Sequence, residues 1–116
     1  MPSLGMQGPY KLDNKTIDSE VSLTSAGNYA LGEKDSDGKF LVDYVGRSDN
    51  DVNARLKAWV EKTKMPLFKY SYATSPKAAF EKECNNYHDF KPPKNDNHPQ
   101  RPANTNWKCP RCNIFG

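Results

Sequence analysis

The sequence predicts an α/β domain of the α+β kind, in which helices flank a small three-stranded antiparallel sheet. Three observations predict this fold class. Short segments rich in aromatic and β-branched residues are typical of strands, two longer segments carry apolar residues at helical spacing, and the residues after 92 show neither pattern. The chain has 116 residues, which is the size of one domain with one modest core.

The first 24 residues are polar and show no clear period. We therefore expect residues 1–24 to form a partly ordered N-terminal extension. A short amphipathic piece around Ile17, Val21 and Leu23 is expected to pack on the core. The pattern sharpens from Gly27, so we expect the folded domain to cover residues 25–92.

A β-hairpin with a long loop is predicted at the start of this domain. Residues 29–31 (Tyr-Ala-Leu) are the candidate first strand, and residues 33–38 (EKDSDG) have turn chemistry that ends in Asp-Gly. Residues 39–46 (KFLVDYVG) are rich in β-branched and aromatic residues and predict the second strand.

A helix is predicted to follow the hairpin. Ser48, Asp49 and Asp51 are all favourable at a helix N-terminus, and Pro66 stops the helix. Its apolar stripe has the spacing i, i+4, i+7 and i+8 and consists of Val52, Leu56, Trp59 and Val60.

A third strand and a second helix complete the predicted domain. The apolar and aromatic residues at 67–72 indicate the strand. Ser75 is a favourable N-cap, Pro76 suits the first helical position, and the helix is expected to run to about Phe90. Residues 93–116 have too few apolar residues for their own core, so we expect them to form a tail that packs on this last helix.

Composition and charge exclude some functional classes. The net charge of +3 and the pI of about 8.7 are compatible with a polyanionic partner but do not demand one. No apolar run approaches the roughly 18 to 20 residues of a membrane span, and the N-terminus lacks the features of a secretory signal. The three cysteines, an odd count, indicate thiols or metal ligands in a reducing compartment. We therefore expect an intracellular, cytoplasmic protein.

Four features resemble the signature of the GIY-YIG nuclease family. The tripeptides at residues 27–29 (Gly-Asn-Tyr) and 44–46 (Tyr-Val-Gly) resemble the paired motif from which the family takes its name. Arg55, on the first predicted helix, resembles the catalytic arginine of the family. Glu83, on the second helix, resembles the metal-binding glutamate. The resemblance covers roughly residues 25 to 90 and implies this family's fold.

The chain departs from the family pattern in ways that bear on substrate geometry more than on fold. Asn28 replaces the usual isoleucine, and Trp59 stands where the family often has a histidine or tyrosine. The hairpin between the two motif tyrosines is longer than is usual in the family. The C-terminal asparagine of the family has no clear match, with Asn95 and Asn97 as candidates.

The resemblance implies a site that hydrolyses phosphodiester bonds. Tyr29 and Tyr44 would flank one water, and a nearby cation would lower the pKa of a tyrosine from its usual value of about 10. Arg55 would bind the scissile phosphate in a fork, and Glu83 would hold one Mg²⁺ or Mn²⁺. Further contacts with the substrate are predicted for Gly46, Arg47 and Lys57.

The tail carries a Cys-x-x-Cys knuckle at Cys109 and Cys112, a spacing that lets two thiolates reach one tetrahedral ion. Cys84 and His88 lie four residues apart on the second predicted helix and so project from one face. We predict a structural zinc site formed by these four residues, with His98 as the substitute ligand if His88 points elsewhere. Two alternatives are a thioredoxin-like redox pair, which the irregular tail disfavours, and a simple turn with free cysteines.

These features predict a divalent-metal-dependent endonuclease that acts on nucleic acid, with DNA favoured over RNA. The alternative is a catalytically inactive module of the same fold that binds nucleic acid or a protein and is stabilised by zinc. A third interpretation, a small zinc-stabilised adaptor, depends on the tail alone. We expect a monomer or weak dimer that does not bind membranes, and a targeting partner is compatible with so small a domain.

Overall fold

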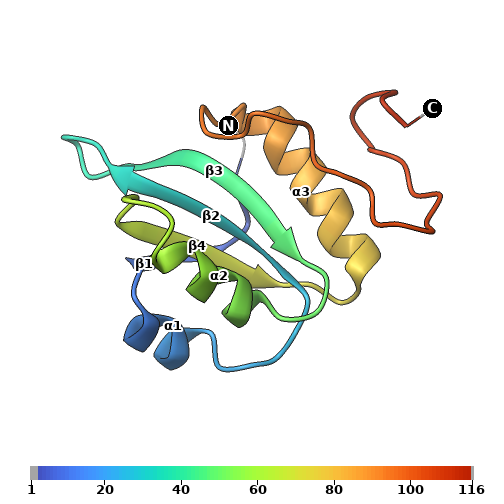
Figure 1. Ribbon diagram of the computed structural model, residues 1–116. Coiled ribbons are helices and arrows are strands. Elements are labelled where there is room, and N and C mark those ends of the chain that lie inside the picture. Colours follow the sequence, from blue (N-terminus) through green and yellow to red (C-terminus); the bar gives the residue numbers. More distant parts are fainter. Residues whose placement is uncertain (1–2, 116) are drawn as a thin grey trace.

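A computed structural model describes residues 3–115, and its fold belongs to the predicted α+β class. Figure 1 shows a twisted sheet with helices on both of its faces. In chain order the elements are β1 (Gln7–Lys11), α1 (Asn14–Glu20), β2 (Gly27–Lys34), β3 (Phe40–Ser48), α2 (Val52–Val60), β4 (Leu67–Tyr72) and α3 (Pro76–Phe90).

The sheet is antiparallel throughout and has four strands in the order β1-β4-β2-β3, one more than predicted. Strands β2, β3 and β4 correspond to the three predicted strands. The additional strand β1 comes from the N-terminal segment and pairs with β4, where Tyr10 lies opposite Phe68. Gly8 and Pro9 lie inside β1, and both are poor strand formers. For that reason the segment shows no strand pattern in the sequence.

The N-terminal segment also contributes to the core. Ile17, in α1, and Val21, which caps it, are fully buried, as predicted. Leu23 is 58% exposed, so the prediction that it packs on the core is wrong. It follows the end of α1, where its backbone N–H donates to the hydroxyl of Tyr72 instead.

Side-chain caps fix where α2 and α3 begin. Of the candidate residues before α2, Asp51 is the N-cap, and its carboxylate accepts a hydrogen bond from the backbone N–H of Ala54. Ser75 caps α3 in the same way, accepting from the N–H of Ala78, and Pro76 occupies the first helical position. The cap of α3 was therefore readable from the sequence.

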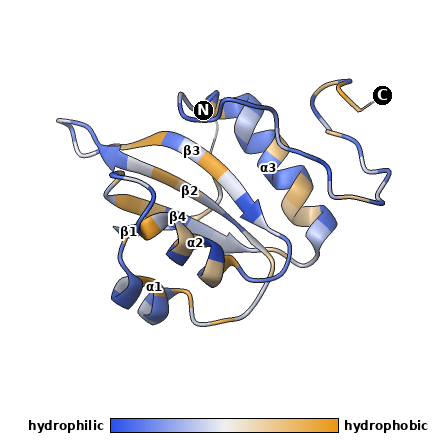
Figure 2. Cartoon of the chain, in the orientation of Figure 1, coloured by the Kyte–Doolittle hydropathy of each residue, from blue (hydrophilic) through white to orange (hydrophobic). Residues whose placement is uncertain are grey.

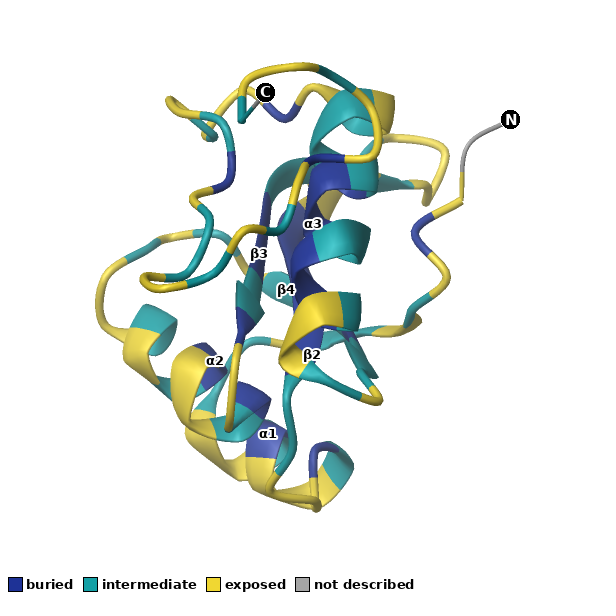
Figure 3. Cartoon of the chain, turned by 90° about the vertical axis from the view of Figure 1, so that its right-hand side faces the viewer, coloured by how far each residue is buried: buried dark blue, intermediate teal, exposed yellow. Residues whose placement is uncertain are grey.

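The sheet separates two apolar cores. Helices α1 and α2 cover the larger core, whose buried side chains include Leu31, Leu56 and Phe68. Helix α3 covers a smaller core on the opposite face, which includes Ala30 and Val45. Figure 2 shows apolar residues concentrated in the strands, and Figure 3 shows buried residues along the strands and the inner side of α3. Within residues 3–115, no helix combines the length and apolar character needed to cross a membrane.

Strand β3 lies at an edge of the sheet, so side chains from both faces of the sheet are close to each other there. Successive side chains of a strand point to opposite faces. Tyr44 packs against the core beneath α2, whereas Val45 belongs to the core beneath α3. Arg47 lies on the same face as Val45, with its guanidinium 5.2 Å from the ring centre of Phe80 on α3. Side chains from both faces can therefore converge around this edge.

Candidate functional site

A pocket of about 260 Å³ lies at the edge of the sheet around β3. Most of the residues singled out from the sequence for catalysis or substrate binding line it, and they come from four different elements. The residues that line the pocket are Tyr29 (β2), Tyr44, Gly46 and Arg47 (β3), Asp49, Arg55 (α2), Glu83 (α3) and Gln100 from the tail. The four predicted catalytic residues, well separated in sequence, thus share one pocket.

Gly46 is required by the position of Tyr29. The two residues lie opposite each other in the β2–β3 ladder. A Cβ atom added to Gly46 would lie 2.5 Å from both Cζ and the hydroxyl oxygen of Tyr29, closer than side chains approach. The indole N–H of Trp59 donates a 2.7 Å hydrogen bond to the same hydroxyl. Trp59 therefore holds the phenol of Tyr29 over Gly46.

The electrostatic environment of the two tyrosines differs from the expectation. Burial raises the pKa of Tyr29 well above its usual range, and it also raises the pKa of Tyr44. The positive charge of Arg55 lowers both pKa values, but its effect is smaller than that of burial. The cation therefore acts in the predicted direction, but burial outweighs it, and both phenols are neutral near pH 7.

Arg47 links the pocket residues to one another. Its Nη1 donates to Oε1 of Glu83 at 2.5 Å, its Nε donates to Oδ1 of Asp49 at 2.9 Å, and its Nη2 donates to the backbone oxygen of Gln100 at 2.7 Å. The Arg47 and Glu83 side chains are only 11% and 9% exposed. Burial raises the pKa of Glu83, although the charge of Arg47 opposes this shift.

The remaining basic residues predicted for the site differ in their surroundings. Arg55 is exposed and forms no ion pair within residues 3–115, so its guanidinium is free to bind an anion. Lys57 does not line the pocket. Its ammonium pairs with Asp18 of α1 at 2.5 Å. On a helix, residues two apart point in different directions, and this explains the separation of Lys57 from Arg55.

Two residues of the pocket were missed from the sequence. Asp49 follows Arg47 by two residues, and this spacing is a local signal that could have paired them. Gln100 lies in the aperiodic tail and contributes its backbone oxygen. No sequence pattern identifies a backbone contact of this kind, because it depends on the path of the tail across the sheet.

A second group of functional side chains lies where the tail meets α3. The ligand atoms of His88, His98, Cys109 and Cys112 all lie within 4.8 Å of one another, so this cluster could hold a metal ion. The sulfur of Cys109 lies 3.3 Å from Nε2 of His88, and the sulfur of Cys112 lies 3.4 Å from Nε2 of His98. Two sulfurs and two imidazole nitrogens are a typical tetrahedral donor set for zinc.

The cluster corrects the predicted ligand set. The sequence predicts Cys84 as a ligand and His98 only as a substitute for His88, but the cluster contains both histidines and leaves out Cys84. The Cys84 side chain is fully buried in an apolar cluster with Phe80 and Cys109. Burial also raises the pKa of its thiol, which disfavours the thiolate that metals bind. The i, i+4 spacing placed Cys84 on the correct face of α3, but it could not place His98 in the tail.

The Cys109 thiol is suited to metal binding. Burial alone would raise its pKa, but hydrogen bonds outweigh this effect and lower the pKa to about 6. These hydrogen bonds come from the backbone N–H of Arg111 and from the side chains of His98, Cys112 and Cys84. A lowered pKa favours the thiolate, which is the form that coordinates metals.

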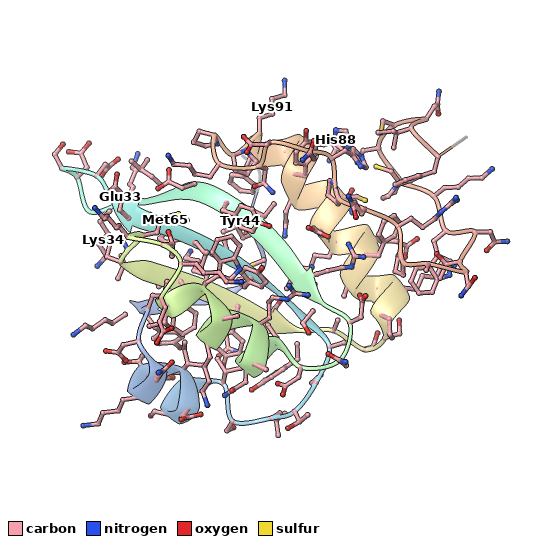
Figure 4. All side chains as sticks on the ribbon, in the orientation of Figure 1. Glu33, Lys34, Tyr44, Met65, His88 and Lys91 are labelled. Atoms are coloured by element: carbon pink, nitrogen blue, oxygen red, sulfur yellow. The ribbon has the colours of Figure 1, made fainter. Side chains whose placement is uncertain are left out.

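The tail connects the metal-ligand cluster to the pocket. The backbone N–H of Lys94 donates to the carbonyl oxygen of Asp43, and the side-chain amide of Asn95 bonds both the N–H and the carbonyl of Val45. His98 then joins the cluster, and Gln100 reaches Arg47. Figure 4 labels His88 on α3, beside the tail. Residues 94–100 thus cross the edge of the sheet and lie against the pocket.

No protein-family model, curated protein or solved structure matches this chain. The pocket offers a free guanidinium, two carboxylates and two neutral phenols within one small space. This set can bind a phosphate, hold a hard cation and orient a water molecule.

Proposed function

We propose that this protein is a divalent-metal-dependent endonuclease that hydrolyses phosphodiester bonds in nucleic acid, with DNA as the preferred substrate over RNA. The observation that carries the proposal is the pocket shared by Tyr29, Tyr44, Arg55 and Glu83. Their order along the chain also resembles the GIY-YIG nuclease signature. Chance placement of four such residues around one pocket is far less frequent than chance occurrence of any one of them.

Arg55 is assigned to the scissile phosphate, because its planar fork matches two phosphate oxygens and its charge is free. Tyr44 is half-buried at the pocket and is assigned to orienting the attacking water through its hydroxyl. Tyr29 is held by Trp59 and positions the ring of Tyr44, with the two ring centres 6.2 Å apart. Neutral phenols suit this positioning role.

Glu83 and Asp49 fit the donor set of a Mg²⁺ or Mn²⁺ ion. Such ions are commonly held by one or two carboxylates, with waters and substrate phosphate oxygens as the other ligands. Both carboxylates line the pocket, and each accepts one hydrogen bond from Arg47. When bound, the ion would supply positive charge that stabilises the developing charge on the phosphate. Arg47 is assigned to holding the two carboxylates in place.

We further propose that a structural zinc ion occupies the cluster of His88, His98, Cys109 and Cys112. Four protein ligands leave no position open for substrate, which is typical of a structural site. The ion would join α3 to both ends of the tail. Because Glu83 lies on α3 and Gln100 lies two residues after His98, the zinc would stabilise two walls of the pocket.

A binding module with no catalytic activity remains the second candidate, and one observation favours it. Arg47 already neutralises Glu83, and the backbone oxygen of Gln100 contacts the same guanidinium. With the Glu83 carboxylate already paired with Arg47, the pocket would bind a phosphate at Arg55 without a divalent cation. Nucleic-acid binding that does not lead to cleavage would be the signature of this module.

The decisive experiment compares wild-type protein with Glu83→Gln on plasmid and single-stranded DNA, each with Mg²⁺ or Mn²⁺. We expect cleavage by the wild type and a loss of about 100-fold or more in Glu83→Gln, as for removal of one group that stabilises charge in a transition state. Glu81→Gln is the matched control, because Glu81 is on the same helix but does not line the pocket. Equal cleavage by all three proteins would indicate a contaminating nuclease and would contradict the assignment of Glu83.

A further inference from the structure

A larger pocket adjoins the candidate catalytic pocket. Its volume is about 530 Å³, within the range of roughly 300–1,000 Å³ that is typical of sites for small molecules. Tyr44 lines both pockets, and a third pocket beneath residues 94–100 shares Tyr44 with them as well. The three spaces therefore adjoin one another around Tyr44 at the β3 edge, and together they are called the groove. Figure 4 labels Glu33, Tyr44 and Met65, which line the larger pocket.

One side of the larger pocket is aromatic and apolar. Tyr44 and Trp59 are half-buried, and their ring centres lie 4.8 Å apart. Met65, from the segment between α2 and β4, completes this side. Flat aromatic side chains beside a flexible thioether suit a planar ring, and stacking of this kind does not depend on the identity of the base.

Three exposed lysines line the same pocket. Lys62 and Lys64 come from the segment after α2, and Lys94 comes from the tail. None of them forms an ion pair with a carboxylate within residues 3–115. Free ammonium groups around an aromatic pocket match the phosphates on either side of one base. The carboxylates of Glu33 and Asp43 also line the pocket and can accept hydrogen bonds from amino groups on a base edge.

We infer that this pocket binds one unstacked nucleotide of a single-stranded nucleic acid, next to the phosphate that is cleaved. The position next to the cleaved phosphate rests on the proposed function, because it assigns the smaller pocket to that phosphate. A base paired in a duplex cannot enter a pocket of this size without leaving its stack. The substrate class is therefore single-stranded or locally unpaired nucleic acid.

The test measures binding separately from cleavage. We would measure binding of a fluorescein-labelled single-stranded DNA oligonucleotide to Glu83→Gln protein, without divalent cations and at several salt concentrations. The same sequence as a full duplex serves for comparison. The variant Lys62→Gln/Lys64→Gln is compared with Lys15→Gln/Lys77→Gln. The control pair removes the same charge from exposed lysines on α1 and α3 that do not line the groove.

We expect Lys62→Gln/Lys64→Gln to weaken single-strand binding about tenfold and to reduce the dependence of log K on log salt by about 0.7 per lysine. The control pair should change neither. In a Trp107→Phe background, the emission of Trp59 should be quenched by the single strand and not by the duplex. Equal effects of the two lysine pairs, absence of quenching, or tighter binding of the duplex would overturn the inference.

The result also separates the two proposals. In one outcome, wild-type protein cleaves DNA while Trp59 is not quenched and the two lysine pairs behave alike. The inference of a nucleotide pocket would then be wrong, and the nuclease proposal would stand. If no cleavage occurs but the single strand quenches Trp59 and requires Lys62 and Lys64, the pocket stands and the nuclease proposal fails.

Discussion

Gly46 has no side chain, and this leaves the space in which the ring of Tyr29 lies. The ring of Tyr29 occupies the space that a Cβ atom of residue 46 would need, and Trp59 bonds its hydroxyl there. The sequence shows this glycine as part of a motif, but the physical reason for it is a contact between two strands that no local pattern reveals. The hydrogen bond from Arg47 to Glu83 likewise could not be read from the sequence, because the two residues lie on different elements.

Gly46→Ala is expected to displace the Tyr29 ring and to destabilise the protein by about 1–3 kcal/mol, the usual cost of overpacking. A double-mutant cycle with Tyr29→Ala, followed by denaturant unfolding, checks the cause. Removing the ring removes the clash, so the destabilisation of Gly46→Ala/Tyr29→Ala should be smaller than the sum of the two single changes. Additive effects would show that the clash with Tyr29 does not cause the destabilisation by Gly46→Ala.

The raised pKa of Tyr29 predicts a loss of stability at alkaline pH. In the unfolded chain a tyrosine ionises at about pH 10, whereas burial keeps the folded phenol protonated. The unfolded state therefore releases a proton first, and stability falls as the pH rises above about 10, by at most about 1.4 kcal/mol per pH unit. The free energy of unfolding should decline less steeply between pH 9 and 11 in Tyr29→Phe than in the wild type, and parallel declines would contradict this.

At the scale of elements, the strands, helices and caps follow local rules, and most of them were predicted. The strands β2, β3 and β4 and the cap of α3 illustrate this, since period and capping are properties of neighbouring residues. The tail is different. Its path is set by hydrogen bonds to β3 and by a cluster whose members lie far apart in the sequence. Local pattern found the Cys109–Cys112 knuckle and placed Cys84 and His88 on one face of a helix, but it could not show that the tail brings His98 to the same place.

Metal content distinguishes the two ligand sets directly. Protein purified with zinc should hold about one ion per chain, and His98→Ala should reduce zinc affinity strongly because it removes one of four ligands. Cys84→Ala should retain the ion, although the smaller side chain lowers stability by opening space in a buried cluster. Loss of zinc from Cys84→Ala together with retention by His98→Ala would restore the set predicted from the sequence.

At the scale of the whole molecule, residues 7–21 belong to the same sheet and core as the rest of the domain. Strand β1 pairs with β4, and the hydroxyl of Tyr70 donates to the backbone oxygen of Glu20. Ile17 and Val21 are fully buried in the larger core. The sequence predicts that Ile17 and Val21 pack on the core, but not the pairing of β1, because a short strand that contains Gly and Pro has a weak local signal.

A chain shortened to residues 25–116 is therefore expected to lose its cooperative unfolding transition. It lacks an edge strand and two fully buried aliphatic side chains, Ile17 and Val21. Each of these side chains contributes about 1.5–3 kcal/mol, out of a total stability of about 5–15 kcal/mol. Thermal unfolding followed by circular dichroism checks this. A chain starting at residue 4 is the control, because it keeps every described helix and strand. A sharp transition in the 25–116 chain would contradict the prediction.

The contact between Asn95 and Val45 has a consequence for how copies of the protein behave toward each other. An edge strand with free N–H and carbonyl groups invites another chain to add to the sheet, and this is a route to aggregation. The Asn95 amide occupies both backbone groups of Val45 near the middle of β3. At the opposite edge, Pro9 removes a donor from β1. The proposed zinc ion would help to hold the tail on this edge, so its removal is expected to favour intermolecular strand pairing through β3.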